Sequence, residues 1–288
     1  MRIARLLLVA HLCALAFGLA GMLVALPNPQ AWASDPVALR VFSLGMTYGG
    51  TTQILLGATA VAVWAGLTIG WRRTAVFFVC STLVSVTSEL VGTGTGWPFG
   101  NYEYTSYLGY KVMDRVPFTI PLSWFFMGLT SYLLGTLLVA RLGLRSRTAW
   151  SLLLGVWLLT AWDLVLDPAM ADAGLRVQFW TWHQTGPYFG MPVQNFLGWS
   201  LTAFAFMALS RLIWGGDLEV APIAARSGFP FTVYGANMVF AMVLNLSVGL
   251  WAPAVLAVAT GVLPTAFASI GASTGRRGGA AVPSRPLP

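Results

Sequence analysis

Three carboxylic acids lie within, or at the end of, otherwise apolar stretches of the sequence: Glu89, Asp163 and Asp167. A carboxylate is expensive to place in hydrocarbon, so acids in such stretches are rare and usually functional. Asp163 and Asp167 are four residues apart, which places them on one face of a helix, one turn from each other. Like-charge repulsion at that spacing favours keeping a proton on at least one of them. A carboxyl group that stays protonated near neutral pH can act as a general acid.

Each acid also has a structural alternative. Thr82, Ser85 and Glu89 fall at positions i, i+3 and i+7, so they form one polar stripe along a helix. Such a stripe could instead make a buried polar contact that joins two helices. Asp167 directly precedes Pro168 and could simply lie in water where a helix ends.

Two long loops, residues 92–117 and 167–192, follow the acid-bearing stretches and are rich in Trp, Tyr, Phe and Gly. Long loops in compact folds are usually functional or disordered, and this composition argues against disorder. Their rings could form the aromatic belt of a bilayer interface. They could also line a groove for a long apolar ligand and stabilise a developing cation. The predicted substrate-binding residues are Trp97, Phe99, Asn101, Tyr102, Tyr104, Trp124, His183, Tyr188, Asn195 and Trp199.

The two loops resemble each other. The first contains Gly96-Trp97-Pro98-Phe99-Gly100 and the second contains Gly186-Pro187-Tyr188-Phe189-Gly190. In each, a later proline precedes a tryptophan by seven residues, at Trp124 and at Trp199. Both units would enter a membrane from the same side, which predicts an internal parallel repeat with a site between the repeats. Chance similarity between two aromatic loops is the alternative.

The elements that position these residues are predicted to be membrane-spanning helices. Hydrophobic residues make up 57% of the 288 and charged residues 9%, whereas a soluble domain carries about 25% charged residues. A spanning helix needs about 20 mostly apolar residues. We therefore predict an all-α, polytopic transmembrane helix bundle of about eight helices, in which the last two are the least clearly separated. The predicted segments are residues 3–26, 48–70, 74–91, 119–140, 148–166, 194–214, 231–250 and 253–271.

The basic residues predict the orientation of this bundle. Twelve arginines fall on one side of the eight-helix arrangement and four basic residues on the other, which is the positive-inside bias. This places both termini in the cytoplasm of a multi-pass cell-membrane protein whose arginines contact lipid head groups. The net charge of +7 does not indicate nucleic acid, because no clustered basic stripe with exposed aromatics accompanies it.

No linker rich in Pro, Gly or Ser divides the chain. We predict a single transmembrane domain over residues 1–272 and a disordered cytoplasmic tail over residues 273–288. The sequence carries no signal for an oligomeric state.

The scarcity of histidine and lysine excludes two kinds of site. His11 and His183 are the only histidines, and two distant histidines cannot hold a di-iron centre. Lys111 is the only lysine and lies in a loop, which excludes a retinal Schiff base within a helix. No phosphate-binding loop or dinucleotide fingerprint is present.

The loop motifs resemble those of the membrane carotenoid-biosynthesis proteins, which include the cofactor-free carotenoid 1,2-hydratases. The first motif runs from Ser88-Glu89-Leu90-Val91-Gly92 through Gly96–Tyr104 to Trp124. The second runs from Asp163-Leu164-Val165-Leu166-Asp167-Pro168 through Gly186–Pro192 to Trp199. The resemblance is strongest over residues 80–200, and the predicted helix number agrees with it over the whole chain.

This resemblance implies a hydro-lyase that adds water to the acyclic end of a carotene, such as lycopene or a monocyclic carotene, and forms a tertiary alcohol at C1. Protonation at C2 and capture of the C1 cation by water require no metal, flavin or other cofactor. The residues suit this chemistry, because a protonated carboxyl can donate the proton and a second carboxylate can orient the water. We predict Asp163 as the acid, Glu89 as the group that positions water, and Asp167 as the residue that tunes Asp163.

Three other functions use the same residues. A transporter or proton-coupled carrier would employ the intramembrane carboxylates for transport. A prenyltransferase would use Asp163 and Asp167 as half of a metal–diphosphate site, but would need a second acidic motif and basic residues. A pigment-binding protein would hold a carotenoid without turnover.

Overall fold

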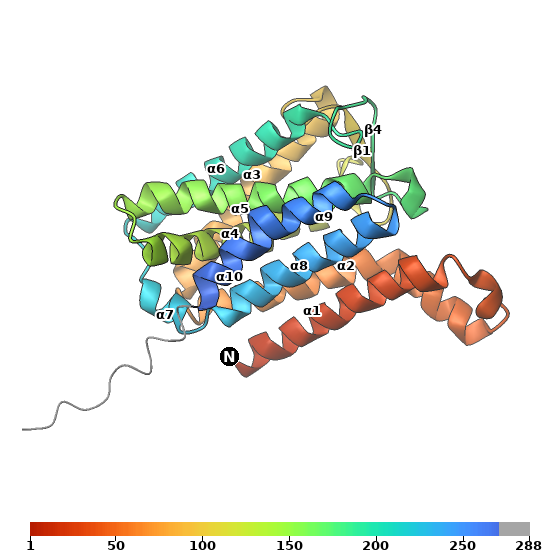
Figure 1. The fold of residues 1–288 in the computed structure, drawn as a ribbon, viewed down its shortest axis with the longest axis horizontal. Coiled ribbons are helices and arrows are strands. Elements are labelled where there is room, and N and C mark those ends of the chain that lie inside the picture. Colours follow the sequence, from red (N-terminus) through yellow and green to blue (C-terminus); the bar gives the residue numbers. More distant parts are fainter. Residues whose placement is uncertain (271–288) are drawn as a thin grey trace, which may run out of the picture.

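The computed structural model describes residues 1–270 and is an all-α polytopic bundle with two small β-ribbons at one end (Figure 1). The predicted tail, residues 273–288, lies outside the described residues. The long helices are α1 (Arg2–Ala20), α2 (Pro36–Gly66), α3 (Trp71–Thr95), α4 (Thr119–Leu142), α5 (Arg147–Met170), α6 (Val193–Trp214) and α8 (Gly228–Ser247). The shorter ones are α7 (Val220–Ala224), α9 (Trp251–Ala257) and α10 (Leu263–Ile270).

Seven stretches of helix within residues 1–270 are long and apolar enough to cross a membrane. They comprise α1 with the π-helical turn Gly21–Ala25 that extends it, then α3, α4, α5, α6, α8, and α9 through α10. Each matches a predicted segment, and the last two are separate helices because the chain turns between Ser247 and Trp251. The eighth predicted segment, 48–70, overlaps the 31-residue α2, which begins earlier and ends at Gly66. Helix α2 is not among the seven, because Gln53 and several glycines and threonines lower its mean hydropathy.

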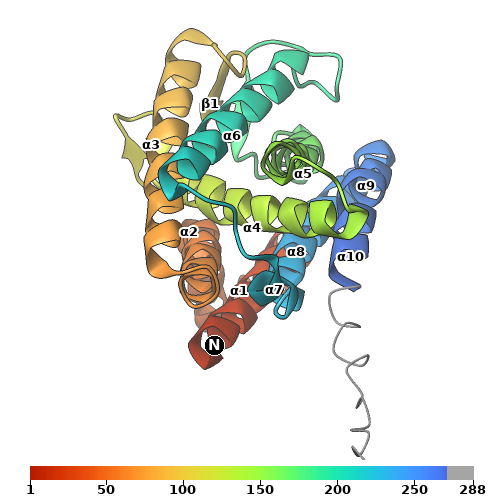
Figure 2. The same ribbon diagram turned by 90° about the vertical axis from the view of Figure 1, so that its left-hand side faces the viewer.

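Helix α4 forms the centre of the bundle. It contacts α3 and α5 on one side and α2, α8 and α10 on the other, and Figure 2 shows it crossing the middle of the molecule. Two glycines allow the close approach of α4 to α5, because a Cβ atom on Gly135 would lie 2.8 Å from the backbone nitrogen of Gly155. Burial of α4 therefore fixes the positions of the helices that carry the acids.

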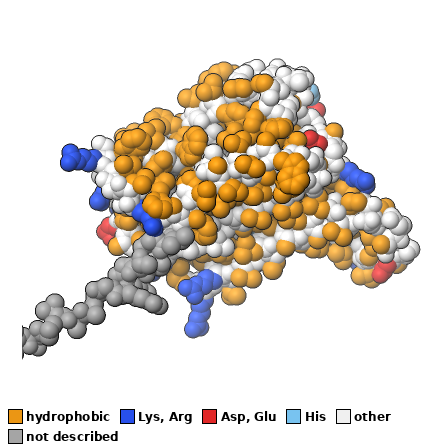
Figure 3. Space-filling view, in the orientation of Figure 1, with side chains coloured by type: hydrophobic (Ala, Val, Ile, Leu, Met, Phe, Trp, Pro, Cys, Tyr) orange, Lys and Arg blue, Asp and Glu red, His pale blue; other side chains and the backbone are white. Residues whose placement is uncertain are grey.

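The outer surface suits contact with lipid. Figure 3 shows hydrophobic side chains over most of the visible face, with charged side chains mainly towards its two ends. Large apolar side chains are exposed along the helices, among them Leu6, Leu83, Leu153, Leu201 and Val255. An exposed apolar band between charged ends is typical of a membrane-embedded protein.

The two long loops meet at one end of the bundle. Strand β1 (Tyr102–Tyr104) pairs antiparallel with β4 (Trp180–Trp182), and Tyr102 lies opposite Trp182. Strands β2 (Lys111–Val112) and β3 (Val116–Pro117) form a second small ribbon within the first loop. The β1–β4 ribbon therefore joins the two units of the predicted repeat, which itself stays a prediction.

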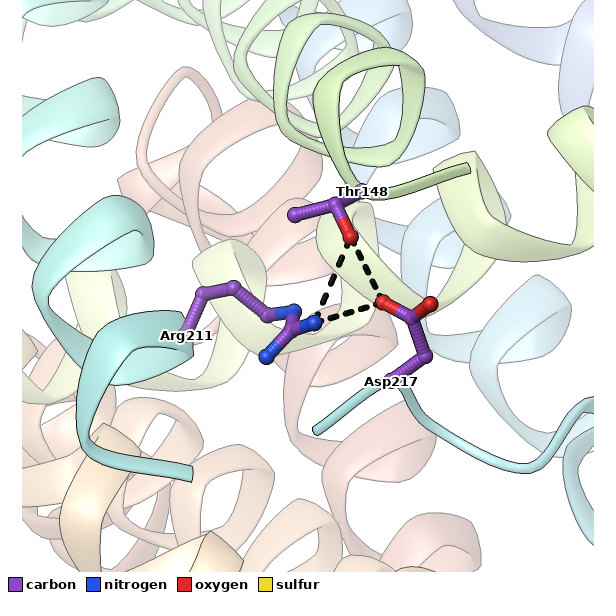
Figure 4. Close-up of polar contacts among 3 residues, drawn as sticks. All are labelled: Thr148, Arg211 and Asp217. Carbon is purple, nitrogen blue, oxygen red and sulfur yellow. Dashed lines mark hydrogen bonds and ion pairs between the residues drawn. The ribbon is translucent and has the colours of Figure 1, made fainter. Parts of the chain in front are cut away.

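The opposite end is held by a polar cluster of Thr148, Arg211 and Asp217 (Figure 4). Thr148 donates to Asp217 Oδ1 over 2.6 Å, and Arg211 Nη2 donates to the same oxygen over 2.7 Å. The hydrogen bond from Thr148, and then the Arg211 guanidinium, lower the pKa of Asp217. This cluster connects the end of α6 to the start of α5.

Candidate active site

Glu89 lies on the inner face of α3 and is the hydrogen-bond acceptor for three aromatic side chains. Trp124 Nε1 donates to Oε1 over 3.0 Å, the hydroxyl of Tyr104 donates to Oε2 over 2.9 Å, and the hydroxyl of Tyr102 donates to the same oxygen. Burial, followed by the charge of Glu89, raises the pKa of Tyr102 and Tyr104 well above their ordinary range. Both phenols therefore keep their protons and act as donors to Glu89.

Asp163 and Asp167 form a second acidic group on α5, held together by one amide. Asn195 Nδ2, in the first turn of α6, donates to Asp163 Oδ2 over 3.0 Å and to Asp167 Oδ2 over 2.6 Å. Both carboxyl groups are buried, and Asp163 Oδ1 has no hydrogen-bond partner among the described residues. Two acids that share one amide donor are close enough to interact strongly with each other.

Pro168 explains why the end of α5 needs support from the second loop. Proline has no backbone N–H, so it cannot donate to the carbonyl of Leu164 four residues earlier. The hydroxyl of Tyr188 takes that place and donates to the Leu164 oxygen over 3.0 Å. Helix α5 thereby continues to Met170, so Asp167 is inside a helix and only 4% exposed. The alternative that Asp167 lies in water at a helix end is not what the structure shows.

A cavity, here called the carboxylate cavity, joins the two acidic groups. Glu89, Asp167 and Asn195 contribute to its wall, whereas Asp163 does not and is held beside Asp167 by the shared amide of Asn195. The predicted residues in the wall are Glu89, Phe99, Tyr102, Tyr104, Trp124, Asp167, Asn195 and Trp199.

The aromatic wall of the carboxylate cavity is closely packed. Trp124 and Trp199, which are equivalent in the two loop motifs, stack with ring centroids 4.0 Å apart. Phe99 contacts Tyr102 edge to face and packs against Trp124. Ring faces of this kind attract positive charge, and the neighbouring carboxylates add a negative field. The site can therefore stabilise a cation.

Four predicted binding residues lie outside the cavity wall. Trp97 is 63% exposed. Asn101 uses its backbone groups to bond to Gln184 and His183. His183 is exposed, with Nε2 3.8 Å from Glu103 Oε1. Tyr188 supports α5 as described above. These residues shape the loops around the site, and their binding role stays a prediction.

Several residues of the cavity wall were not predicted. Gln53 comes from α2, and Asn237 and Phe240 come from α8, which lie far from the loop motifs in the sequence. Trp162 and Trp182 also line the cavity, and the indole nitrogens of both have no hydrogen-bond partner among the described residues, nor does Gln53 Oε1. The only sequence signal for Gln53 is its position as a lone amide in an apolar helix.

No histidine or cysteine is among the described residues that line the carboxylate cavity. His11 Nδ1 donates to the backbone carbonyl oxygen of Gln53 over 2.8 Å, and His11 Nε2 lies 3.2 Å from Asn237 Nδ2. Asn237 thus makes an interhelical contact. Within residues 1–270, no three His, Cys, Asp or Glu side chains are grouped so that they could hold a metal ion.

Comparisons with known proteins agree with the loop motifs. Residues 49–264 match the family described as carotenoid biosynthesis protein. The bisanhydrobacterioruberin hydratase of Haloarcula japonica is 33% identical over 190 residues, which are 66% of this chain and 60% of that protein. The chain thus spans less than two thirds of its curated relative, and no solved structure matches it. Since the family match covers both motifs, both acidic groups and most of the bundle, the chain belongs to the carotenoid biosynthesis protein family.

Proposed function

We propose that this protein is a carotenoid hydratase that adds water across the C1–C2 double bond at an acyclic end of its substrate. The observation that carries the proposal is the carboxylate cavity, in which Glu89 and Asp167 face a space lined mainly by aromatic and aliphatic side chains. The hydratase named among the relatives supports the same reaction type. Hydration is neither an oxidation nor a reduction, so acids, a base and water suffice for it.

The first step is transfer of a proton from the Asp163–Asp167 pair to C2 of the alkene. Asn195 holds both carboxyl groups by their Oδ2 atoms, and one proton shared between them removes most of their mutual repulsion. From the sequence we expected Asp163 to be the acid, with Asp167 tuning it. The cavity wall favours the opposite order, in which Asp167 meets the substrate and Asp163 supports it.

The second step is capture of the tertiary C1 cation by water. Glu89 is the group best suited to orient that water and to accept its proton. Its three donors, Tyr102, Tyr104 and Trp124, hold its carboxylate in one orientation. The stacked rings of Trp124 and Trp199 lie in the same wall, where their faces stabilise the cation before water arrives. The proton lost to Glu89 balances the proton given by the aspartate pair.

The further features of this proposal come from the sequence and from what its family resemblance implies. The substrate is lycopene or a monocyclic carotene, no cofactor takes part, and the enzyme is a hydro-lyase in the cell membrane with both termini in the cytoplasm. One transmembrane domain, residues 1–272, carries the whole activity. Family membership and the named relative do not favour the carrier alternative.

Oxygen labelling tests the proposal directly. Membranes from a host that makes lycopene and expresses this chain are incubated either in labelled water or under labelled dioxygen. We expect the carotenoid to gain the mass of one water at each reacting end, with label from water only. Label from dioxygen would exclude hydration. Substrate flux into proteoliposomes without chemical change would indicate a carrier instead.

A further inference from the structure

A second cavity adjoins the carboxylate cavity on the side of α1 and α2. It lies between these two helices, which pack side by side (Figures 1 and 2). Its remaining wall comes from the loop after β1, the end of α5, the segment before β4, and α8. Among the described residues that line it, none is charged. We call it the glycine-lined cavity, after Gly18, Gly21, Gly45, Gly49 and Gly50 in its wall.

The two cavities share part of their walls. Gln53, Leu108, Met170 and Phe240 line both. Three of these four side chains are apolar, and the fourth, Gln53, has a buried Oε1 atom without a partner among the described residues. The partition between the cavities is therefore only one side chain thick, and most of it consists of groups that a hydrocarbon can contact.

Four of these glycines fall into two pairs that differ in what a side chain at the position would meet. A Cβ atom on Gly45 would lie 2.9 Å from Phe17 Cε1, and one on Gly50 would lie 3.0 Å from the carbonyl oxygen of Tyr107, so packing explains both. A Cβ atom on Gly21 or Gly49 would meet nothing within 4 Å. No neighbour in the protein requires glycine at these two positions, and glycine in a helix interior weakens the helix. The absence of side chains there leaves open space inside the bundle.

We infer that the glycine-lined cavity holds the linear isoprenoid chain of the substrate behind the end that reacts. The inference rests on the proposed function and extends it. A long polyene reacts at its end and is apolar everywhere else, so it needs one polar region and a continuous apolar region. The carboxylate cavity supplies the first and the glycine-lined cavity supplies the second. Methionine side chains, here Met22 and Met46, adapt their shape to an apolar ligand and make favourable contacts with π systems.

Filling the open space at Gly49 tests the inference. A Cβ atom at Gly49 has no neighbour within 4 Å, so the series Gly49→Ala, Gly49→Leu and Gly49→Phe places successively larger side chains in the wall of the glycine-lined cavity. Gly235→Phe is the matched control, because Gly235 is in α8, has nothing within 4 Å and lines neither cavity. Each variant is expressed with lycopene, purified, and assayed for total carotenoid retained per protein and for hydrated product.

We expect retention to fall along the series, with Gly49→Phe at least about tenfold below Gly235→Phe, because a filled pocket rejects even small added groups. Equal retention by these two variants would overturn the inference. If Gly49→Phe does not accumulate as folded protein, Gly21→Leu and Gly49→Leu are compared with Gly235→Leu in the same way. Carotenoid retained by the unaltered protein without any hydrated product would overturn the proposed function and leave the binding comparison intact.

Discussion

Replacement of each aspartate by its neutral isostere distinguishes the acid that meets the substrate from the one that supports it. Asp167 is in the wall of the carboxylate cavity and Asp163 is not. In either variant the new amide can turn its oxygen toward Asn195 Nδ2 and keep the hydrogen bond that the carboxyl accepts now. Each change also removes a buried carboxyl group whose charge its neighbour disfavours, so neither Asp167→Asn nor Asp163→Asn should lower the free energy of unfolding appreciably.

The two variants should differ in activity. Asp167→Asn removes the proton donor, and general acid catalysis contributes about 10²–10⁴-fold, or about 3–5.5 kcal/mol of activation free energy. Asp163→Asn leaves the donor in place and removes only the group that shares its proton. The loss should then be that of one charge-assisted hydrogen bond, about 1.5–3 kcal/mol, or roughly 10–150-fold.

The assay compares hydrated carotene formed per folded protein for the unaltered chain and the two variants, with thermal unfolding in detergent as the measure of folding. Asp167→Asn should be the more severe of the two by about tenfold or more. A more severe effect of Asp163→Asn would restore the order predicted from the sequence. Retention of most activity by Asp167→Asn would refute acid catalysis by this pair.

Two further predictions concern residues that hold the ends of helices, one beside the site and one at the opposite end of the bundle. Tyr188→Phe should lower the free energy of unfolding by about 1–3 kcal/mol, because it leaves the Leu164 oxygen without its donor. The control is Tyr110→Phe, at a residue that is 74% exposed. Equal melting temperatures for these two variants would contradict the supporting role of Tyr188. Asp217→Asn should cost less than about 1 kcal/mol at neutral pH, because the Asp217 side chain in the Arg211–Asp217 ion pair is 56% exposed. Since the pKa of Asp217 is lowered in the folded state, its contribution is present above the ordinary carboxyl pKa and is lost as the pH falls through the folded value. The difference in melting temperature between Asp217→Asn and the unaltered protein should therefore disappear in acid, and a difference that grows in acid would show that the sign is wrong.

The helices could be predicted well because the bilayer imposes a simple rule of length and hydropathy on them. All eight predicted segments correspond to helices, and only α2 begins much earlier than predicted, at Pro36 after the N-cap Asp35. The seven spans detected in the structure omit this helix, since Gln53 and its glycines make it less apolar. Gln53 lines both cavities, and glycines of α2 line the glycine-lined one. The least apolar of the predicted helices is therefore the one that contributes space and a polar group to the interior.

The site was predictable only as far as local sequence patterns reach. Glu89, Asp163 and Asp167 stand out because acids are rare in apolar stretches, and the motifs place Trp124 and Trp199 in equivalent positions. Sequence spacing could not show that Asp167 is in the cavity wall and Asp163 is not, because both are on the same face of α5 one turn apart. It also could not show that Gln53 and Phe240 reach the cavity, since contacts between α2, α8 and the loops depend on how the whole bundle packs.

Helix α4 has a consequence for how the protein is made. In its most apolar stretch 89% of the residues are buried by other helices, compared with 17% in α1. Several of the helices that cover α4, including α5, α8 and α10, follow it in the sequence and are synthesised after it. During synthesis α4 must therefore enter the lipid before those neighbours exist. Its apolar composition serves this temporary exposure as much as the final packing, so a polar substitution tolerated in the finished core could still block insertion of the nascent chain.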